Sequence, residues 1–335
     1  MIAVTDAAEQ IACLSRPRVL VAGDVVLDEY LYGRPTRLSR EAPIPVLELT
    51  RRATIPGGAA NPAHNITALG ARATLAAVVG DDPEGRHLIE VLRGAHVDPS
   101  CVLVDPSRPT TVKTRIVSEG LLRFPQQIAR IDRISRTEVH ERIVASLTAL
   151  VEAHAAEADA ILCSDYLSGL LTARLAQAIR ATCMTRGLLW TVDAQGELDK
   201  YRGADLLRCN NDEASNFLRR GLEHEQDFAS GLQEMSERLE VGLVVVTRGA
   251  QGVSLRGRDV PYAHLPAHKV EVADVTGAGD TFIAVLTLAL ASGTAPLAAA
   301  ELANAAAALV VRRVGNAVVT PDELRAAIAD ERGAS

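Results

Sequence analysis

Apolar and polar positions follow two alternating periods along most of this chain. Short apolar runs rich in β-branched residues, which predict buried strands, are separated by segments with the 3.6-residue period of amphipathic helices. We expect strands at residues 18–23, 73–79, 160–164, 188–192, 206–209 and 243–247, and helices at residues 1–16, 61–69, 84–94, 137–154, 172–186, 213–219, 228–240, 281–291, 297–311 and from 320. This βαβ order predicts an α/β fold with a doubly wound, mainly parallel sheet and helices on both faces.

Two segments interrupt this order. Residues 28–56 and 110–132 contain extended, alternating sequence without a helical pattern, so each predicts strands inserted into the α/β unit. We expect them to form one small β lid on a single domain that spans residues 1–335. An apolar alternate set in these strands, Ile44, Val46 and Ile116, would stay partly uncovered in a single lid, which predicts a homodimer through the lids.

Composition disfavours several classes of protein. Lys and Arg total 35 against 42 Asp and Glu, a net charge of −7, and no basic run suits a nucleic acid. The five cysteines are scattered without a Cys-x-x-Cys pair, as is typical of buried thiols in a reducing compartment. The N-terminus lacks the pattern of a secretory signal, and the longest mostly apolar run, residues 282–291, is too short to cross a bilayer. We therefore expect a cytoplasmic protein without a membrane or nucleic-acid partner.

The segment 274–281, Asp-Val-Thr-Gly-Ala-Gly-Asp-Thr, places a glycine-rich turn directly before an apolar helix. Gly277 and Gly279 have no Cβ, so N–H groups can point at an anion there, and the helix dipole favours negative charge at the same place. Asp280 then lies where it can accept the proton of a hydroxyl that attacks a bound phosphoryl group. An acid that only caps the helix is the competing interpretation.

A second glycine turn, Gly57-Gly58, leads into the helix that contains Asn61. The two glycines allow a sugar or phosphate to approach the main chain, and the Asn61 amide can both donate to and accept from a hydroxyl. Asp28 follows the first strand, at the sheet edge where ligands of such folds bind, and its carboxylate can accept from two adjacent sugar hydroxyls. A capped tight turn and a solvated loop acid are the competing interpretations.

Cationic side chains occur at alternate positions of the lid. Lys113 and Arg115 are two residues apart in a strand and therefore share a face, as Arg123 and Arg130 would in the neighbouring segment. If that face is the cleft, these side chains suit a substrate that already carries a phosphate. A solvated face is the alternative.

Two further motifs follow strands. The amide and carboxylate of Asn210-Asn-Asp-Glu213 can hold Mg²⁺, directly or through water, beside nucleotide phosphates. The hydroxyl and glycines of Thr247-Arg-Gly249-Ala-Gln-Gly252 suit a phosphate tail. A helix cap and a hairpin turn are the simpler interpretations of the two motifs.

Together these motifs resemble, in order and rough spacing, the ribokinase-like (pfkB) carbohydrate kinases, over about residues 17 to 325. The resemblance implies transfer of the γ-phosphoryl group of ATP to a sugar hydroxyl, with Mg²⁺ and a monovalent cation, K⁺, as cofactors. It implies roles for the following residues: Asp280 as base; Gly277, Ala278 and Gly279 as anion hole; Asp28, Gly58 and Asn61 at the sugar; Asn210, Glu213, Thr247 and Gly249 at the magnesium and nucleotide, with Glu213 acting on Mg²⁺ through water; Asp274 and the Thr276 carbonyl at the monovalent cation; and Asn304 at the adenine.

Three segments, 23–33, 39–46 and 126–132, look like the branch of the family that phosphorylates O1 of D-glycero-β-D-manno-heptose 7-phosphate, a precursor of the ADP-heptose of lipopolysaccharide. Many members of this heptose branch are fused to a nucleotidyltransferase, which we do not expect in a chain that ends at Ser335. Where the branch reads Asp-Pro-Lys-Gly, this chain has Asp193-Ala-Gln-Gly196, and its lid segment 118–125 looks longer. Both departures lie near the expected cleft, so a related sugar or sugar phosphate is an alternative acceptor.

Three other functions fit the residues less well. A kinase for an unmodified hexose, pentose or nucleoside has no use for cationic lid residues in the cleft. A non-catalytic protein that senses sugars or nucleotides has little reason to keep Asp280 together with its glycines. A nicotinamide dehydrogenase is disfavoured, because the first strand is followed by Gly23-Asp-Val-Val-Leu-Asp28 rather than by Gly-x-Gly-x-x-Gly.

Overall fold

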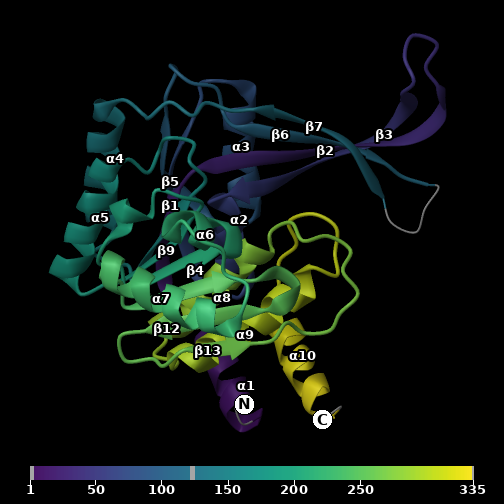
Figure 1. Cartoon of the computed structure of the whole chain (residues 1–335). Coiled ribbons are helices and arrows are strands. Elements are labelled where there is room, and N and C mark those ends of the chain that lie inside the picture. Colours follow the sequence, from purple (N-terminus) through teal and green to yellow (C-terminus); the bar gives the residue numbers. More distant parts are fainter. Residues whose placement is uncertain (1–3, 121–124, 334–335) are drawn as a thin grey trace.

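A nine-stranded sheet forms the centre of the molecule, in the order β13-β12-β11-β10-β9-β8-β1-β4-β5. The computed structural model describes residues 4–120 and 125–333 (Figure 1). The strands of this sheet are β1 (Arg18–Gly23), β4 (Arg72–Val79), β5 (Asp98–Val104), β8 (Ala160–Asp165), β9 (Leu189–Ala194), β10 (Leu206–Asn210), β11 (Leu243–Thr247), β12 (Val253–Gly257) and β13 (Ala263–Leu265). Neighbours from β5 to β11 pair in parallel, whereas β12 and β13 pair antiparallel.

Helices cover both faces of this sheet. The helices are α1 (Val4–Cys13), α2 (Ala60–Ala68), α3 (Pro83–Gly94), α4 (Glu141–His154), α5 (Ala173–Arg186), α6 (Asn211–Leu218), α7 (Glu225–Leu239), α8 (Ala278–Ala291), α9 (Pro296–Val310) and α10 (Pro321–Gly333), with 3-10 turns at Leu198–Tyr201 and Gly249–Gln251. Alternate residues of β1 enter different cores: Val19 and Val21 pack with α2, α3, α8 and α9, and Leu20 and Ala22 pack with α4, α5 and α7. Burial of both faces explains why the strands are continuous apolar runs.

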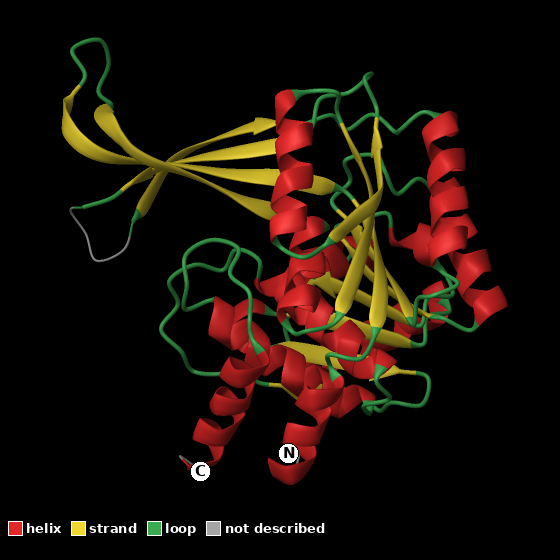
Figure 2. Ribbon diagram, turned by 180° about the vertical axis from the view of Figure 1, so that it is seen from behind, coloured by secondary structure: helices red, strands yellow, loops and turns green. Residues whose placement is uncertain are grey.

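A second, four-stranded sheet projects from one side of this body (Figures 1 and 2). It has the order β3-β2-β6-β7 and consists of β2 (Val25–Leu38), β3 (Pro45–Gly58), β6 (Val112–Ser118) and β7 (Gln126–Arg133). β2 follows β1 after the single residue Asp24, and β3 ends two residues before α2. The sheet therefore continues directly from the edge where the central parallel strands end.

The predicted fold class, with its small inserted lid sheet, is confirmed. The division into domains stays a prediction. Several element bounds were wrong: the lid begins at Val25, β3 begins after Ile44, and α4 begins at Glu141 because His140 accepts a hydrogen bond from the N–H of Arg142. The patterns also missed β5 and β13, and they gave β12 only through the alternative of a hairpin turn after Thr247, which the structure has. Among the described residues no helix combines the length and hydropathy needed to cross a membrane.

Candidate active site

Helix α8 begins at the carboxyl edge of the central sheet, beside the ends of β8 and β9. Gly277 precedes the helix as its N-cap with φ +78°, a conformation that favours glycine. Asp280 lies in the first turn and is buried. The N–H of Ala278 donates to the Val275 carbonyl at 3.3 Å, so the later N–H groups of this turn and the helix dipole are what can stabilise an anion beside the Asp280 carboxylate.

Two side chains from other parts of the chain hold the Asp280 carboxylate. The Nδ2 of Asn61, on α2, donates to one oxygen at 2.7 Å, and the hydroxyl of Tyr166, after β8, donates to the other at 2.6 Å. Burial and the negative charge of Asp193 raise the pKa of Asp280 to about 7, against the effect of both hydrogen bonds and of Arg208. A carboxylate with a pKa near neutrality is well matched to accept a proton from a sugar hydroxyl.

A cavity of about 150 Å³ lies in front of this carboxylate. Its lining residues are Asp165, Tyr166, Asp193, Gln195, Arg208, Gly277, Gly279 and Asp280. The predicted base and both glycines of the predicted anion hole thus border one polar space. Ala278 lies between these glycines as the first residue of α8.

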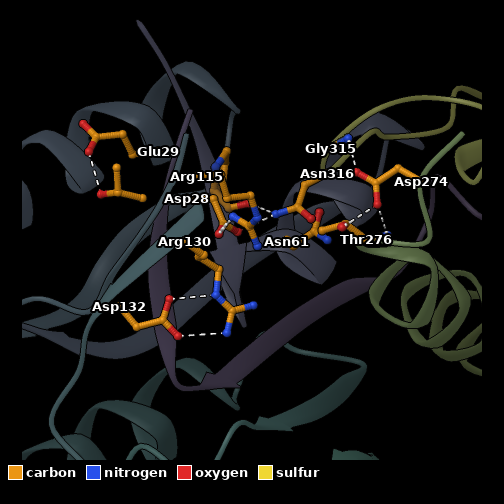
Figure 3. A network of polar contacts seen from close by, with 12 residues as sticks. Asp28, Glu29, Asn61, Arg115, Arg130, Asp132, Asp274, Thr276, Gly315 and Asn316 are labelled. Carbon is orange, nitrogen blue, oxygen red and sulfur yellow. Dashed lines mark hydrogen bonds and ion pairs between the residues drawn. The ribbon is translucent and has the colours of Figure 1, made fainter. Parts of the chain in front are cut away.

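The predicted sugar residues of the lid contact each other. Asp28 is buried, forms an ion pair with Arg115, and accepts a hydrogen bond at 2.7 Å from Asn316 (Figure 3). A Cβ on Gly57 would lie 2.0 Å from Asp28 Oδ2, and a Cβ on Gly58, which has φ +58°, would lie 2.2 Å from the Asp24 carbonyl. Packing around Asp28 and Asp24 therefore explains both glycines, and their contact with substrate stays a prediction.

Strand register places the predicted lid cations on one face of the lid. Lys113 is the cross-strand partner of Asp28, and Arg115 is the partner of Arg130. The Lys113 ammonium lies 5.4 Å from the centre of the Tyr166 ring. Arg130 forms an ion pair at 2.9 Å with Asp132, the cross-strand partner of Lys113 (Figure 3). This face, which we call the cleft face, therefore leads from the Asp280 region outwards. Arg123 lies outside the described residues, as do its neighbours 121, 122 and 124 in the segment 118–125.

Asp24, beside Asp28 at the start of the lid, is a structural residue. Its carboxylate accepts hydrogen bonds from the N–H groups of Tyr166, Ser168 and Leu170 at 2.9 to 3.2 Å. The carboxylate fixes the loop that carries Tyr166, and this use explains its burial.

The residues predicted to bind nucleotide follow β10 and β11. Asn210 and Glu213 form a reciprocal capping box on α6, so the simpler interpretation of this motif describes their contacts. Burial raises the pKa of Glu213. Its carboxylate, at the sheet edge, is of the chemical type that binds Mg²⁺ through water.

The second nucleotide motif forms the turn between β11 and β12. Thr247 accepts a hydrogen bond from Arg208 at 2.7 Å, and a Cβ on Gly249 would meet nothing within 4 Å, so a ligand has open access there. Gly252 packs against the Leu265 carbonyl. On α9, Asn304 donates to the Pro266 carbonyl at 2.9 Å.

Asp274 organises the loop before α8. It accepts hydrogen bonds from the N–H and the hydroxyl of Thr276 and from the N–H of Gly315, at 2.7 to 2.9 Å (Figure 3). Although burial opposes the effect, these hydrogen bonds lower the pKa of Asp274, so the carboxylate is charged at neutral pH. A charged, fixed carboxylate is an oxygen ligand of the kind that a monovalent cation requires. Asp274 and Thr276 therefore fit the predicted cation site.

The model of the pfkB family of carbohydrate kinases matches residues 17–323. The chain belongs to this family. The kinase is 39% identical over 312 residues to the bifunctional protein HldE of Geotalea uraniireducens, and 41% identical over 306 residues to HldE of Geobacter metallireducens. These matches cover 93% and 91% of the kinase but 63% and 61% of the relatives, so the chain spans less than two thirds of their length. The predicted family and enzyme class are confirmed.

Solved structures share the fold of the kinase. Phosphofructokinase-2 from Escherichia coli in complex with fructose-6-phosphate has a TM-score of 0.76 at 21% identity, over 94% of this chain and 99% of that chain. Arabidopsis thaliana ribokinase complexed with ribose and ATP has a TM-score of 0.70 at 19% identity, over 93% and 99%. At such identities the likeness establishes the fold alone.

Sequence reasoning missed three residues of the kinase site. Tyr166 and Asn316 reach Asp280 and Asp28 through long-range contacts, and nothing in their local sequence indicates this. Arg208 carried a signal, because it is a charged residue inside the apolar run of β10. The roles of the predicted site residues in binding and catalysis stay predictions.

We predict that Asp280→Asn lowers kcat by about 10² or more, because the amide cannot accept the proton. The same change should raise the free energy of unfolding at about pH 8 by about 1–4 kcal/mol, because ionising this buried carboxyl destabilises the fold as the pH rises through its folded pKa. The gain should vanish below about pH 4, where the carboxyl is protonated in both states. Steady-state kinetics and denaturant unfolding measure both effects. The exposed Asp322→Asn is the control, and an Asp280→Asn enzyme of normal kcat contradicts the assignment.

The pH dependence of kcat/KM should have an acid limb near pH 7, with activity rising as Asp280 ionises and level above that pH. Tyr166→Phe removes a hydrogen bond that lowers the pKa of Asp280, so the limb should move to higher pH. The substrate phosphates titrate in the same way with the wild-type and the Tyr166→Phe enzyme. A difference between the two pH profiles therefore comes from a group of the enzyme. Coincident profiles would mean that Asp280 does not set this limb.

Proposed function

We propose that the kinase transfers the γ-phosphoryl group of ATP to O1 of D-glycero-β-D-manno-heptose 7-phosphate, a step towards ADP-heptose for lipopolysaccharide. The observation that carries the proposal is the row of cations beside Asp28 on the cleft face of the lid. The resemblance of segments 23–33, 39–46 and 126–132 to the heptose branch and the match to HldE over more than 90% of this chain support it. The five unpaired cysteines fit a cytoplasmic enzyme.

The proposed reaction is an in-line displacement at phosphorus. The O1 hydroxyl gives its proton to Asp280 as the bond from O1 to Pγ forms, and the bond from Pγ to ADP breaks with its electron pair leaving on ADP. The N–H groups at the start of α8 stabilise charge on the transferred group, while Asn61 and Tyr166 orient the base. Glu213 would hold Mg²⁺ on the nucleotide through water, and the ion would neutralise phosphate charge when bound.

The cationic residues of the lid lie at different distances along it, and we assign them different roles. Lys113 lies beside Tyr166, at the reacting end of the sugar, and Arg115 is engaged with Asp28. Arg130, half-exposed on β7, is opposite Arg115 and therefore one same-face cross-strand pair farther along the lid than Lys113, a position that suits a phosphate at the distal end of a heptose. We therefore assign the 7-phosphate mainly to Arg130, and the orientation of Asp28 to Arg115.

Arg130→Ala should reduce kcat/KM for a sugar 7-phosphate by about 10- to 100-fold, the effect of one lost charge-assisted hydrogen bond, and change the rate for the same sugar without phosphate far less. ADP release with both acceptors measures the ratio. Arg133→Ala is a matched control, because Arg133 is on the same strand but pairs with Asp82 and Glu84 on the opposite face. Equal losses with both acceptors would favour a kinase for an unphosphorylated sugar or nucleoside, and no turnover with any acceptor would favour the sensing protein.

Potassium should raise activity, because a cation at Asp274 and the Thr276 carbonyl would stabilise the loop that forms the anion hole. We expect a higher kcat in potassium than in tetramethylammonium at matched ionic strength, and little difference in Asp274→Asn. Equal kcat of the wild-type enzyme in potassium and in tetramethylammonium would contradict a cation site at Asp274 and Thr276.

We also propose a homodimer through the lids. The face opposite the cleft face carries Leu31, Leu49, Ile116 and Ile131, of which Leu49 is 66% and Ile131 61% exposed. Ile44, which the sequence pattern grouped with Val46 and Ile116, lies in the loop before β3. Light scattering at micromolar concentration should give a dimer mass, and Ile131→Asp should give a monomer because it buries a charge in the interface. A wild-type monomer would refute the arrangement.

A further inference from the structure

Arg208 occupies a position at the active site that the motifs of the sequence do not explain. Of the described residues that line the cavity in front of Asp280, Arg208 alone is cationic, whereas three lining residues are carboxylic acids: Asp165, Asp193 and Asp280. A transferred phosphoryl group would bring further negative charge to the same space. Lys200, which does not line this cavity, pairs with Asp165 at 2.7 Å, so Arg208 faces the charges of Asp193, of Asp280 and of a transferred phosphoryl group.

The Arg208 guanidinium lies against the predicted anion hole. A Cβ on Gly279 would come within 2.7 to 3.0 Å of Nη2, Nη1 and Cζ, so the missing side chain of Gly279 leaves room for this group. Nη1 donates to Asp193 at 2.7 Å and Nη2 donates to Thr247 at 2.7 Å. The Nε of Arg208 is buried and has no hydrogen-bond partner among the described residues. Each Nη nitrogen carries a second N–H, and the two Nη atoms lie beside Gly279 at the cavity, so these N–H groups can donate to a phosphoryl oxygen.

The neighbouring strand offers a reason for this arginine. The resemblance to the heptose branch implies Asp-Pro-Lys-Gly where this chain reads Asp193-Ala-Gln-Gly196, so Gln195 stands at the position that the resemblance gives to a lysine. Gln195 lines the same cavity as Arg208, and Arg208 is the cross-strand partner of Asp193 on β9. One positive charge is thus absent from the end of β9 and one is present on the adjacent strand β10.

We propose that Arg208 is a catalytic residue of this kinase that binds the transferred phosphoryl group and supplies the charge that Gln195 lacks. The inference rests on the proposed phosphoryl transfer. As the O1–Pγ bond forms and the bond to ADP breaks, Arg208 donates to a non-bridging oxygen of the phosphoryl group, while the O1 proton goes to Asp280 and ADP leaves with the electron pair. The simpler role, in which Arg208 only neutralises buried Asp193, is the alternative that the experiment must exclude.

A double variant separates the two roles. Arg208→Met alone should lower kcat by about 10²- to 10³-fold, but it leaves Asp193 buried without its partner and can destabilise the fold. Asp193→Asn combined with Arg208→Met removes both charges of the pair, and thermal unfolding checks that the enzyme is folded. We expect this double variant to stay at least about 10²-fold slow. If it regains the wild-type kcat, Arg208 serves only to neutralise Asp193 and the inference fails.

A lysine at position 195 tests whether a positive charge at that position can replace the charge of Arg208. Adding Gln195→Lys to the double variant should restore kcat by about 10-fold or more, because the ammonium enters the same cavity. Gln195→Met in the same background is the control for side-chain length and should restore nothing. Equal rates for the lysine and methionine variants would contradict the exchange.

Nucleotide binding gives a readout that does not depend on turnover. In calorimetric titrations with Mg²⁺ present, the double variant should bind β,γ-imido-ATP about 10-fold more weakly than wild type and bind ADP equally well, because only the former has a γ-phosphoryl group. Equal affinities of the two enzymes for β,γ-imido-ATP overturn the role of Arg208. Wild-type enzyme that binds neither nucleotide overturns the kinase function itself, so the two failures are distinguishable.

Discussion

The buried carboxylate of Asp280 is the constraint around which the active site is arranged. A carboxylate out of water at the start of α8 requires donors, and Asn61 from α2 and Tyr166 from the loop after β8 supply them. The next residue of α8, Thr281, donates to Asn65, which in turn donates to the Asn61 carbonyl. Three separate segments thus hold the predicted base, whose pKa is raised to about 7 by the same burial and by Asp193.

The lid is joined to this arrangement through Asn316. Its amide donates to Asp28 on β2, and its side-chain oxygen lies 3.0 Å from the point where a Cβ on Gly277 would be. A sugar hydroxyl that binds Asp28 must therefore share that carboxylate with Arg115 and Asn316. Asn316 therefore lies between the predicted sugar residue Asp28 and the turn at Gly277.

Local patterns predicted the features that depend on neighbouring residues. The turn from Gly277 to Asp280 was predictable because a few adjacent residues determine both its conformation and its chemistry, and the strands because both of their faces are buried. The short strands β12 and β13 were not among the predicted strands. They lie at the edge of the sheet, where antiparallel pairing with a neighbouring strand, rather than a long apolar run in the sequence, makes them strands. Tyr166, Asn316 and the pairing of Asp28 with Arg115 depend on contacts between distant segments, which spacing along the chain does not encode.

The central claim is that O1 of a heptose 7-phosphate lies beside Asp280 and receives the phosphoryl group. The most direct test is the structure of the product formed from D-glycero-β-D-manno-heptose 7-phosphate, Mg²⁺ and ATP, determined by phosphorus and proton nuclear magnetic resonance. The account predicts one new phosphate whose phosphorus couples to the anomeric proton, with one ADP released per product. Coupling of the new phosphate to any other sugar proton, or no transfer to this sugar while another acceptor is phosphorylated, would contradict it.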